Sequence, residues 1–355
     1  MARKRVIYQS EALFAGPTGA GELTQLSRVQ TANYGFDITR QDVNQYGQLA
    51  AIDRIILEQP IVNLDFSYYA NTGLNESLIG LTVDSTRSAL ANILSGAGDV
   101  KNFYILVSPE GTDANIDTLQ ATGQGKTIGI GNANLTSYSI EAAVGAIPTA
   151  TVNAEGYNMK FYPQTTGNTP DINPINGAPN SISTFAIPIP VTGGGYTALR
   201  PGDVSLSISG IGVNASDLKI QSFTINADIG RDPIQKLGNK FAFTREIVFP
   251  VIVSASVEAV MGDIGDKDDN FGNALTNIVC DESATYDLTL TLGKPSTSCG
   301  GGTTQALAYV LKGVKLDSQS FSSAIGDNKT VTMDFSTQIG GPNDLGRGLF
   351  IRGTV

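Results

Sequence analysis

The chain contains no histidine and no tryptophan, and only two of its 355 residues are cysteines. Without histidine, neither a Ser-His nor a Cys-His catalytic pair can form, and the commonest metal ligand is missing. Charged residues make up only 16% of the chain and the formal net charge is −10, which argues against a protein that neutralises nucleic-acid phosphates. We therefore expect a protein that is not an enzyme and that uses no cofactor or metal.

Long apolar segments are also missing. The charged start, Met1 to Arg5, is not followed by an apolar run of signal-peptide length, and no stretch is long enough to span a membrane. The sequence therefore predicts a protein that is made and stays in a cytoplasm. There, Cys280 and Cys299 are most simply interpreted as reduced structural thiols, with a disulfide as the alternative. Glycine, by contrast, is abundant at 40 residues, which favours short strands and turns.

Two local motifs resemble ligand-binding loops, but each lacks residues that its loop requires. Gly125-Lys126-Thr127 resembles the end of a phosphate-binding loop, but Gln120 stands where that loop needs a glycine. Asp266, Asp268 and Asn270 have the spacing of a calcium loop, but Phe271 replaces its glycine and Asn277 its bidentate glutamate. We interpret the second motif as a solvated turn that caps a following helix.

What the chain does contain is an internal repeat. The segment from Asp37 to Gly47 returns 191 residues later as Asp228 to Gly238, with Asp, Ile, Arg and Gly at the same four places. Further blocks follow in order at offsets of 185, 183 and 181. These blocks are Ala89–Leu94 on Ala274–Val279, Phe103–Val107 on Tyr286–Leu290, and Leu135–Thr151 on Leu316–Thr332. Small loop deletions between two copies of one domain leave this pattern, so the chain is predicted to be a tandem duplication.

Alternating apolar and polar residues predict half-buried strands at the same places of both copies. Residues 32–38 and 62–68 alternate in the first copy, and residues 253–259 alternate in the second. Each copy therefore has one polar, acid-containing strand face. The residues of these two equivalent faces are Asn63, Asp65, Ser67, Ser254, Ser256 and Glu258.

The remaining segments complete a mainly β fold. One helix is predicted to begin at Asp84 or Ser85 and to end at Gly96, with a counterpart near residues 270–279. Residues 1–28 are expected to form an arm that packs on a neighbour or frays. The strand pair 204–208 and 218–229 is interpreted as an addition in the second copy. We predict two β-sandwich domains, each with one flanking helix, at residues 1–163 and 184–355, joined by a Pro/Asn/Gly-rich linker at 164–183.

Two groups of segments resemble the major tail tube proteins of long-tailed bacteriophages. The first is Gly230–Gly238 followed by Arg245–Pro250, and the second is Leu135–Ala150. This resemblance of pattern covers most of both copies. It implies a β-sandwich with a flanking helix, in which strands of neighbouring subunits join into one continuous barrel. Some members of that family carry two such domains per chain and form trimeric rings with pseudo-six-fold symmetry, and the duplication matches that variant.

The resemblance implies a virion structural protein of the phage tail that is assembled in the cytoplasm of a bacterial host. Its partners would be further copies of itself in stacked trimeric rings, the tape measure protein, and the tail terminator and baseplate proteins. Genomic DNA would pass through without sequence recognition. A wall that carries DNA without holding it should be polar and neutral to negative, because lysine or arginine would bind phosphates. We therefore expect the two polar faces, Asn63, Asp65, Ser67 and Ser254, Ser256, Glu258, to line the lumen; faces that touch solvent on an ordinary β-sandwich are the alternative.

Four arginines recur at equivalent places, Arg40 with Arg231 and Arg54 with Arg245. We expect them to pair with acids of an adjoining domain or ring, such as the cluster that includes Asp263 and Asp266; surface arginines of little energetic weight are the alternative. Two other functions fit the composition. One is a capsid-decorating or adhesin-like β-sandwich, and the other is the inner tube of a contractile injection machine.

Overall fold

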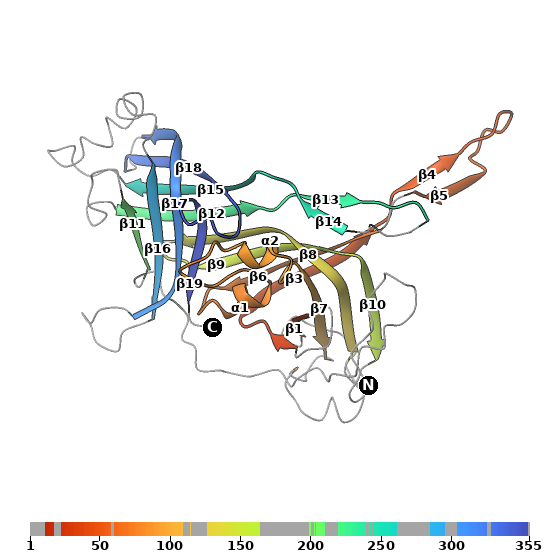
Figure 1. The fold of residues 1–355 in the computed structure, drawn as a ribbon, viewed down its shortest axis with the longest axis horizontal. Helices are drawn as coiled ribbons and strands as arrows, with labels where there is room; N and C mark the ends of the chain where they lie inside the picture. The colour runs from red at the N-terminus through yellow and green to blue at the C-terminus, as the bar shows by residue number, and fades with distance from the viewer. Residues whose placement is uncertain are drawn as a thin grey trace.

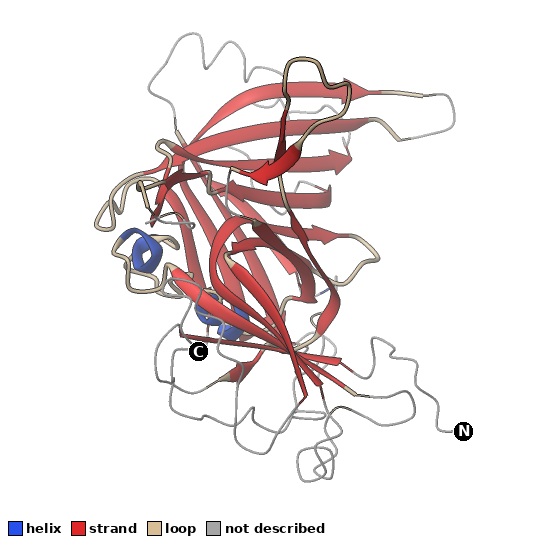
Figure 2. Ribbon diagram, turned by 90° about the vertical axis from the view of Figure 1, so that its right-hand side faces the viewer, coloured by secondary structure: helices blue, strands red, loops and turns tan. Residues whose placement is uncertain are grey.

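The computed structural model describes residues 11–17, 23–57, 60–108, 114, 126–163, 199, 202, 204–209, 219–238, 242, 244–260, 285–294, 304–324 and 328–353. Strands account for 66% of these residues and helices for 4%. Figure 2 shows two short helices beside an otherwise all-strand body. The mainly β prediction is therefore confirmed. The linker at 164–183, Asp263, Asp266, both cysteines and the second predicted helix lie outside the described residues.

The described part of the first half contains ten strands and two single-turn helices. They are β1 (Glu11–Pro17), β2 (Thr24–Gln25), β3 (Val29–Asp37), β4 (Arg40–Val43), β5 (Asp53–Ile56), β6 (Ile61–Tyr69), α1 (Leu74–Leu78), α2 (Ala91–Leu94), β7 (Val100–Val107), β8 (Lys126–Ala143), β9 (Thr149–Gly156) and β10 (Asn158–Pro163).

The described part of the second half contains nine strands. They are β11 (Val204–Ser209), β12 (Lys219–Asp228), β13 (Arg231–Ile234), β14 (Thr244–Ile247), β15 (Val251–Val260), β16 (Tyr286–Lys294), β17 (Thr304–Ser322), β18 (Thr330–Ile339) and β19 (Gly348–Gly353).

One antiparallel layer runs through both halves of the molecule (Figure 1). Its strands follow one another in the order β3, β6, β9, β8, β12, β15, β18, β17. The long strands β8 and β17 then continue into a second layer, where β8 pairs with β7 and β10 and β17 pairs with β16 and β19. A bulge marks the bend of each long strand, between Leu135 and Ser137 and between Leu316 and Ser318.

The strand registers of the first layer repeat with the offsets that the sequence shows. In the first half Phe66 lies opposite Ala32 and Val152, and in the second half Val257 lies opposite Phe223 and Met333. These positions differ by 191 residues for the first two strands and by 181 for the third. The hairpin tips repeat as well, since Gly47 and Gly238 both have φ of 88°, a conformation that favours glycine. The repeat of the sequence is thus a repeat of strand pairing.

The second layer repeats too, and it corrects two expectations. In the first half Phe103 pairs with Ala15 and Ile130, and in the second half Leu288 pairs with Ile208 and Leu311. Strand β7 therefore matches β16 at an offset of 185 residues, and the offset of 183 expected from the sequence is wrong by two residues. An error of two residues does not change which side chains of the strand face the core, because side chains alternate between the faces. Strands β11 and β12 are the counterparts of β1 and β3, so they are not an addition in the second half.

Two further local expectations differ from the structure. Residues 11–17 are not part of a frayed arm; they form β1 on β7, with Leu13 and Ala15 in the core. The flanking helix is only the single turn α2, because the Asp84 carboxylate accepts hydrogen bonds from the main-chain N–H and the hydroxyl of Thr86 and holds a turn there instead.

The core lies between the two layers and is continuous from one half to the other. It includes Leu64, Phe66 and Ile140 from the first half and Val257 and Phe335 from the second, all at most 1% exposed. The alternation predicted for β6 and β15 is confirmed, since Val62, Leu64, Phe66 and Tyr68, and likewise Val253, Ala255, Val257 and Ala259, are buried. The two halves therefore share one sheet and one core.

Candidate assembly surfaces

The outer face of the first layer is polar along its whole width. Its strands present mainly serine, threonine, asparagine and acids at alternate positions. Exceptions lie at the strand ends, where Lys219 of β12 is opposite Val260, Lys315 of β17 is opposite Ser336, and Ile61 and Ile252 are exposed. The acids at these positions are Asp37, Asp65, Glu141, Glu155, Asp228, Glu258 and Asp334. All six residues predicted to line a lumen lie on this face, on β6 and β15. The neighbouring strands carry the other polar residues, which sequence reasoning did not single out.

Hydrogen bonds across the strands organise this face in the same way in both halves. In the first half the Ser137 hydroxyl lies 2.7 Å from the Asn153 amide, whose nitrogen, with the amide oriented to donate, lies 3.1 Å from Asp65 Oδ1. At the equivalent positions the Asp334 carboxylate accepts hydrogen bonds from Ser318 at 2.6 Å and Ser256 at 2.8 Å. Asp37 in the first half and Glu258 in the second also accept cross-strand hydrogen bonds, from Asn63 at 3.1 Å and Ser222 at 3.3 Å. Carboxylates of both halves are therefore held in place by neighbouring polar side chains.

The two halves meet where β8 pairs with β12. Residues Ser137–Ala143 of β8 lie opposite Ser222–Asp228 of β12 in antiparallel register. The main-chain N–H of Ile229 donates to Thr136 O at 2.8 Å, and that of Val144 donates to Gln221 O at 2.8 Å, so the ladder extends beyond both strand ends. Among the described strands, none other than β18 pairs with β17 at Ser320–Ser322, and none other than β6 pairs with β3.

Two of the four predicted interface arginines hold this junction together. The hairpin β13–β14 lies along the first half of the chain (Figure 1). From it, Arg231 Nη2 reaches Asp99 Oδ1 at 2.7 Å, a close ion pair whose angles are not those of a hydrogen bond, and Arg231 Nε donates to Leu135 O at 3.2 Å. Arg245 Nη1 donates to Glu155 O at 3.0 Å and lies 3.5 Å from Glu155 Oε2.

The Arg245 side chain is almost completely buried. Its guanidinium lies 4.4 Å from the centre of the Tyr157 ring, and burial lowers its pKa while Tyr157 and Glu155 raise it. The arginines therefore contact acids of the adjoining half of the chain, and these acids are Asp99 and Glu155. The suggested partners Asp263 and Asp266 lie outside the described residues.

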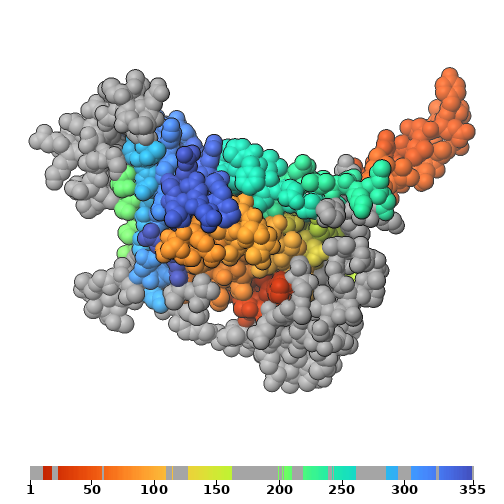
Figure 3. Space-filling model, in the orientation of Figure 1, coloured from red at the N-terminus to blue at the C-terminus, as the bar shows by residue number. Residues whose placement is uncertain are grey.

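The equivalent arginines of the first half, Arg40 and Arg54, are exposed. They lie on the hairpin β4–β5, which projects from the body of the molecule (Figures 1 and 3). The Arg54 side chain contacts the nearby Asp42, at 2.6 Å. The same hairpin exposes many apolar side chains, namely Tyr46, Leu49, Ile52, Ile55, Ile56 and Leu57. A projecting apolar arm of this kind is typical of a surface that contacts another protein.

A buried polar cluster forms a second connection between the halves. The Glu76 carboxylate on α1 accepts hydrogen bonds from the hydroxyls of Tyr68 at 2.9 Å, Tyr138 at 3.1 Å and Tyr309 at 3.0 Å, all through Oε1. Tyr138 and Tyr309, which lie on the long strands of different halves, are 2.7 Å apart at their hydroxyls. Burial raises the pKa of Glu76 despite these donors. Nothing in the sequence pattern identified this cluster, because each member stands alone in its strand or helix.

Replacement of Glu76 by glutamine tests the charge of this cluster. The pKa of Glu76 is higher in the folded chain than in the unfolded chain. The protonated carboxyl therefore contributes its full stabilisation at pH values below the unfolded-state pKa, and this stabilisation is lost as the pH rises through the folded-state pKa. The Glu76→Gln variant should therefore be more stable than wild type at pH 7, by on the order of 1 kcal/mol, and equally stable near pH 4.

Urea unfolding at several pH values measures this difference. Glu246→Gln, at an exposed position of β14 outside the cluster, is the control for the loss of one carboxylate. A Glu76→Gln variant that is less stable than wild type at pH 7 would show that the ionised carboxylate stabilises the cluster.

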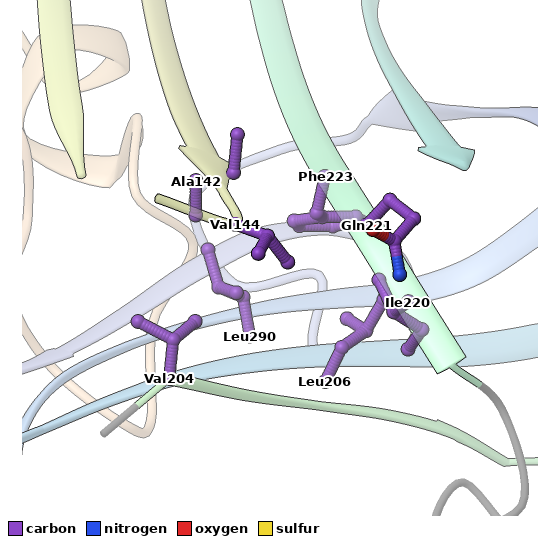
Figure 4. Close-up of a pocket in the computed structure, with 9 residues that line it drawn as sticks. Ala142, Val144, Val204, Leu206, Ile220, Gln221, Phe223 and Leu290 are labelled. Carbon is purple, nitrogen blue, oxygen red and sulfur yellow. The ribbon is translucent and has the colours of Figure 1, made fainter. Parts of the chain in front are cut away.

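A small apolar cavity lies beside the β8–β12 junction (Figure 4). Its volume is about 80 Å³, and the end of β8 forms one wall of it. The residues around it are Ala142, Ala143, Val144, Val204, Leu206, Ile220, Gln221, Phe223 and Leu290. The cavity is too small for most organic ligands, which occupy pockets of about 300 Å³ or more. We interpret it as a packing gap between the two halves.

No model of a known protein family matches this sequence, and a search of curated proteins finds no match. In the part of the chain that the structure describes, no helix combines the length and the apolar character that crossing a membrane requires. The surfaces described above are therefore the basis for a functional conclusion.

Proposed function

We propose that this chain is a structural protein that assembles with copies of itself into rings, and that these rings stack into the hollow tail tube of a long-tailed bacteriophage. The observation that carries the proposal is the β8–β12 junction. This junction pairs β8, at one edge of the first repeat's part of the sheet, with β12, at the facing edge of the second repeat's part. The two outer edges of the whole sheet are β17 and β3, and these are the equivalents of β8 and β12. The pairing that joins the repeats within a chain can therefore join one chain to the next.

A closed ring removes both free edges of the sheet. Exposed edge strands are sites of uncontrolled association, and natural proteins cover them or close the sheet into a barrel. Three chains would bring six similar repeats around one axis, in keeping with the trimeric, pseudo-six-fold rings that the family resemblance implies. The polar face supports the assignment of a lumen, because acids and neutral polar groups predominate at the outward positions of its strands. Such a wall repels phosphates and lets DNA pass without binding it.

Electron microscopy of the concentrated, purified protein tests this function. Negative-stain images with rotational averaging should show hollow rings or tubes with three-fold symmetry and a six-lobed outline. Particles without a central hole would overturn the proposal and favour a capsid-decorating or adhesin-like protein. A contractile machine's inner tube would give similar rings, and a sheath on tails purified from infected cells would identify that alternative.

A further inference from the structure

We propose that β17 of a second copy of this chain adds to β3 in one specific register, with Ser320 of the second copy opposite Gly35. This inference rests on the proposed function and names the surface and the partner through which a ring closes. Its template is inside the chain, since Ser139 lies opposite Asn226 at the β8–β12 junction. Ser320 and Gly35 stand at the equivalent places, 181 residues after Ser139 and 191 before Asn226.

The side chains at the two free edges fit this register. Tyr34 and Phe36 on β3 and Phe321 on β17 point to the core side of the sheet, yet Phe36 is 56% and Phe321 48% exposed. The register sets Phe321 opposite Tyr34, where Ile140 lies opposite Ile225 in the internal junction. Phe36 is then the diagonal neighbour of Phe321. Aromatic pairs across strands stabilise a sheet, so the exposed aromatic residues of one edge cover those of the other.

An open pocket marks the place that the second copy would cover. Leu13, Val29 and Ile105 line a pocket of about 190 Å³ beside β3, together with Glu11, Gln30 and Ala32. Their counterparts Leu206, Ile220 and Leu290 line the smaller cavity beside the internal junction.

The two pockets differ in one wall. The internal cavity has Ala142 and Ala143 at the end of β8 as a wall, and the open pocket has no equivalent among the described residues. The positions equivalent to these alanines are Ser323 and Ala324, at the end of β17. In the proposed register, Ser323 and Ala324 of the second copy supply the missing wall.

Arg40 and Arg54 would find main-chain hydrogen-bond acceptors on the second copy at the same interface. Arg231 donates to Leu135 O and Arg245 to Glu155 O within the chain. Their counterparts Arg40 and Arg54 would donate to the equivalent main-chain oxygens of a second copy, those of Leu316 and Ser336. The main-chain acceptors are repeated but the acid is not, because serine replaces Glu155. At Arg54 the proposed contact between chains therefore consists of the hydrogen bond to the Ser336 carbonyl group, without the ion pair that Glu155 provides for Arg245.

Engineered disulfides test the register. In a full-length chain with Cys280 and Cys299 changed to serine, the pair Gly35→Cys and Ser320→Cys should give covalent dimers and trimers on oxidation of the assembled protein. A Cβ added at Gly35 meets no atom within 4 Å, so the substitution is tolerated. The pair Gly35→Cys and Ser318→Cys is displaced by two residues from the proposed register. It should give at least roughly ten-fold less cross-linked product, because a disulfide needs Cβ atoms about 4 Å apart.

Two further variants keep the result unambiguous. The pair Ser139→Cys and Asn226→Cys, at the internal junction, should form an intramolecular disulfide, identified by mass spectrometry of linked peptides, and calibrates the chemistry. If the first pair disturbs folding, Asn33→Cys with Ser322→Cys tests the same register.

Rings that form but cross-link only through the offset pair would overturn the register and leave the tube proposal standing. Cross-linked dimers without rings would confirm the edge contact and contradict the tube. A monomer with neither would contradict both.

Discussion

Replacement of Arg231 by alanine should lower the free energy of unfolding of the isolated chain by about 3 kcal/mol, whereas the equivalent change at Arg40 should alter it by less than about 0.5 kcal/mol. The Arg231 side chain is 3% exposed and lies 2.7 Å from Asp99 Oδ1. Its removal leaves a largely buried carboxylate oxygen without its cation and Leu135 O without its donor. The lower end of the usual range applies because the Asp99 side chain keeps 22% exposure.

Urea or thermal unfolding of the monomer measures both changes. Arg40 is the matched control, since it occupies the same position of the repeat but lies on the exposed hairpin β4–β5. In the assembled protein the order should change, and Arg40→Ala should raise the concentration at which rings form. Equal losses of monomer stability for the two variants would show that the hairpin β13–β14 does not hold the halves together.

Replacement of Phe321 by lysine should abolish ring formation while the monomer stays folded. Phe321 is 48% exposed in the single chain, so lysine is accommodated there. At the interface between chains the lysine would lose the aromatic contact with Tyr34 and the hydration of its ammonium group. Glu11, which lines the pocket beside β3 and lies near Tyr34, would compensate that charge in part, so we expect a net cost of about 3 kcal/mol. A loss of about 3 kcal/mol per contact already raises the dissociation constant about 100-fold. Analytical ultracentrifugation and electron microscopy measure assembly, and circular dichroism checks the fold.

Two variants decide whether the effect arises at this edge. Leu345→Lys changes an equally exposed apolar residue in the loop between β18 and β19 and should leave assembly unchanged. Tyr34→Glu combined with Phe321→Lys places opposite charges across the proposed pair in every interface and should restore part of the assembly. Rings formed by Phe321→Lys alone would exclude pairing of β17 with β3.

The sequence predicted the inner strands of this fold well. Strands β6 and β15 alternate strictly between apolar and polar residues, because one face packs on the core and the other does not, and the period of two is visible in any single strand. The offsets of 191 and 181 that relate the halves also follow from the sequence, and the strand registers repeat with the same spacing. The polar face of these two strands was therefore predictable residue by residue.

Elements buried on both sides or shortened by their context were not predictable in this way. Strand β1 is apolar at nearly every position and ends at Gly16 and Pro17, so its period is hidden and its glycines and proline suggested a loop. The helix after Asp84 was predicted too long, because the turn closed by Asp84 competes with helix formation. Strand β19 is the counterpart of β10, but a longer loop precedes it, which conceals the match.

The sequence by itself determined that the chain is a repeat of two similar units, where their inner strands lie, and that one strand face of each is polar and acidic. Local periodicity and self-similarity carry that information. Only the tertiary structure decided which copies of the repeated residues are inside: Arg231 is buried and Arg40 is exposed, although both occupy the same place in the repeat. The reason is that a single chain contains the junction between its two halves only once. In the described part of the chain, the equivalent outer strands β17 and β3 do not pair with each other.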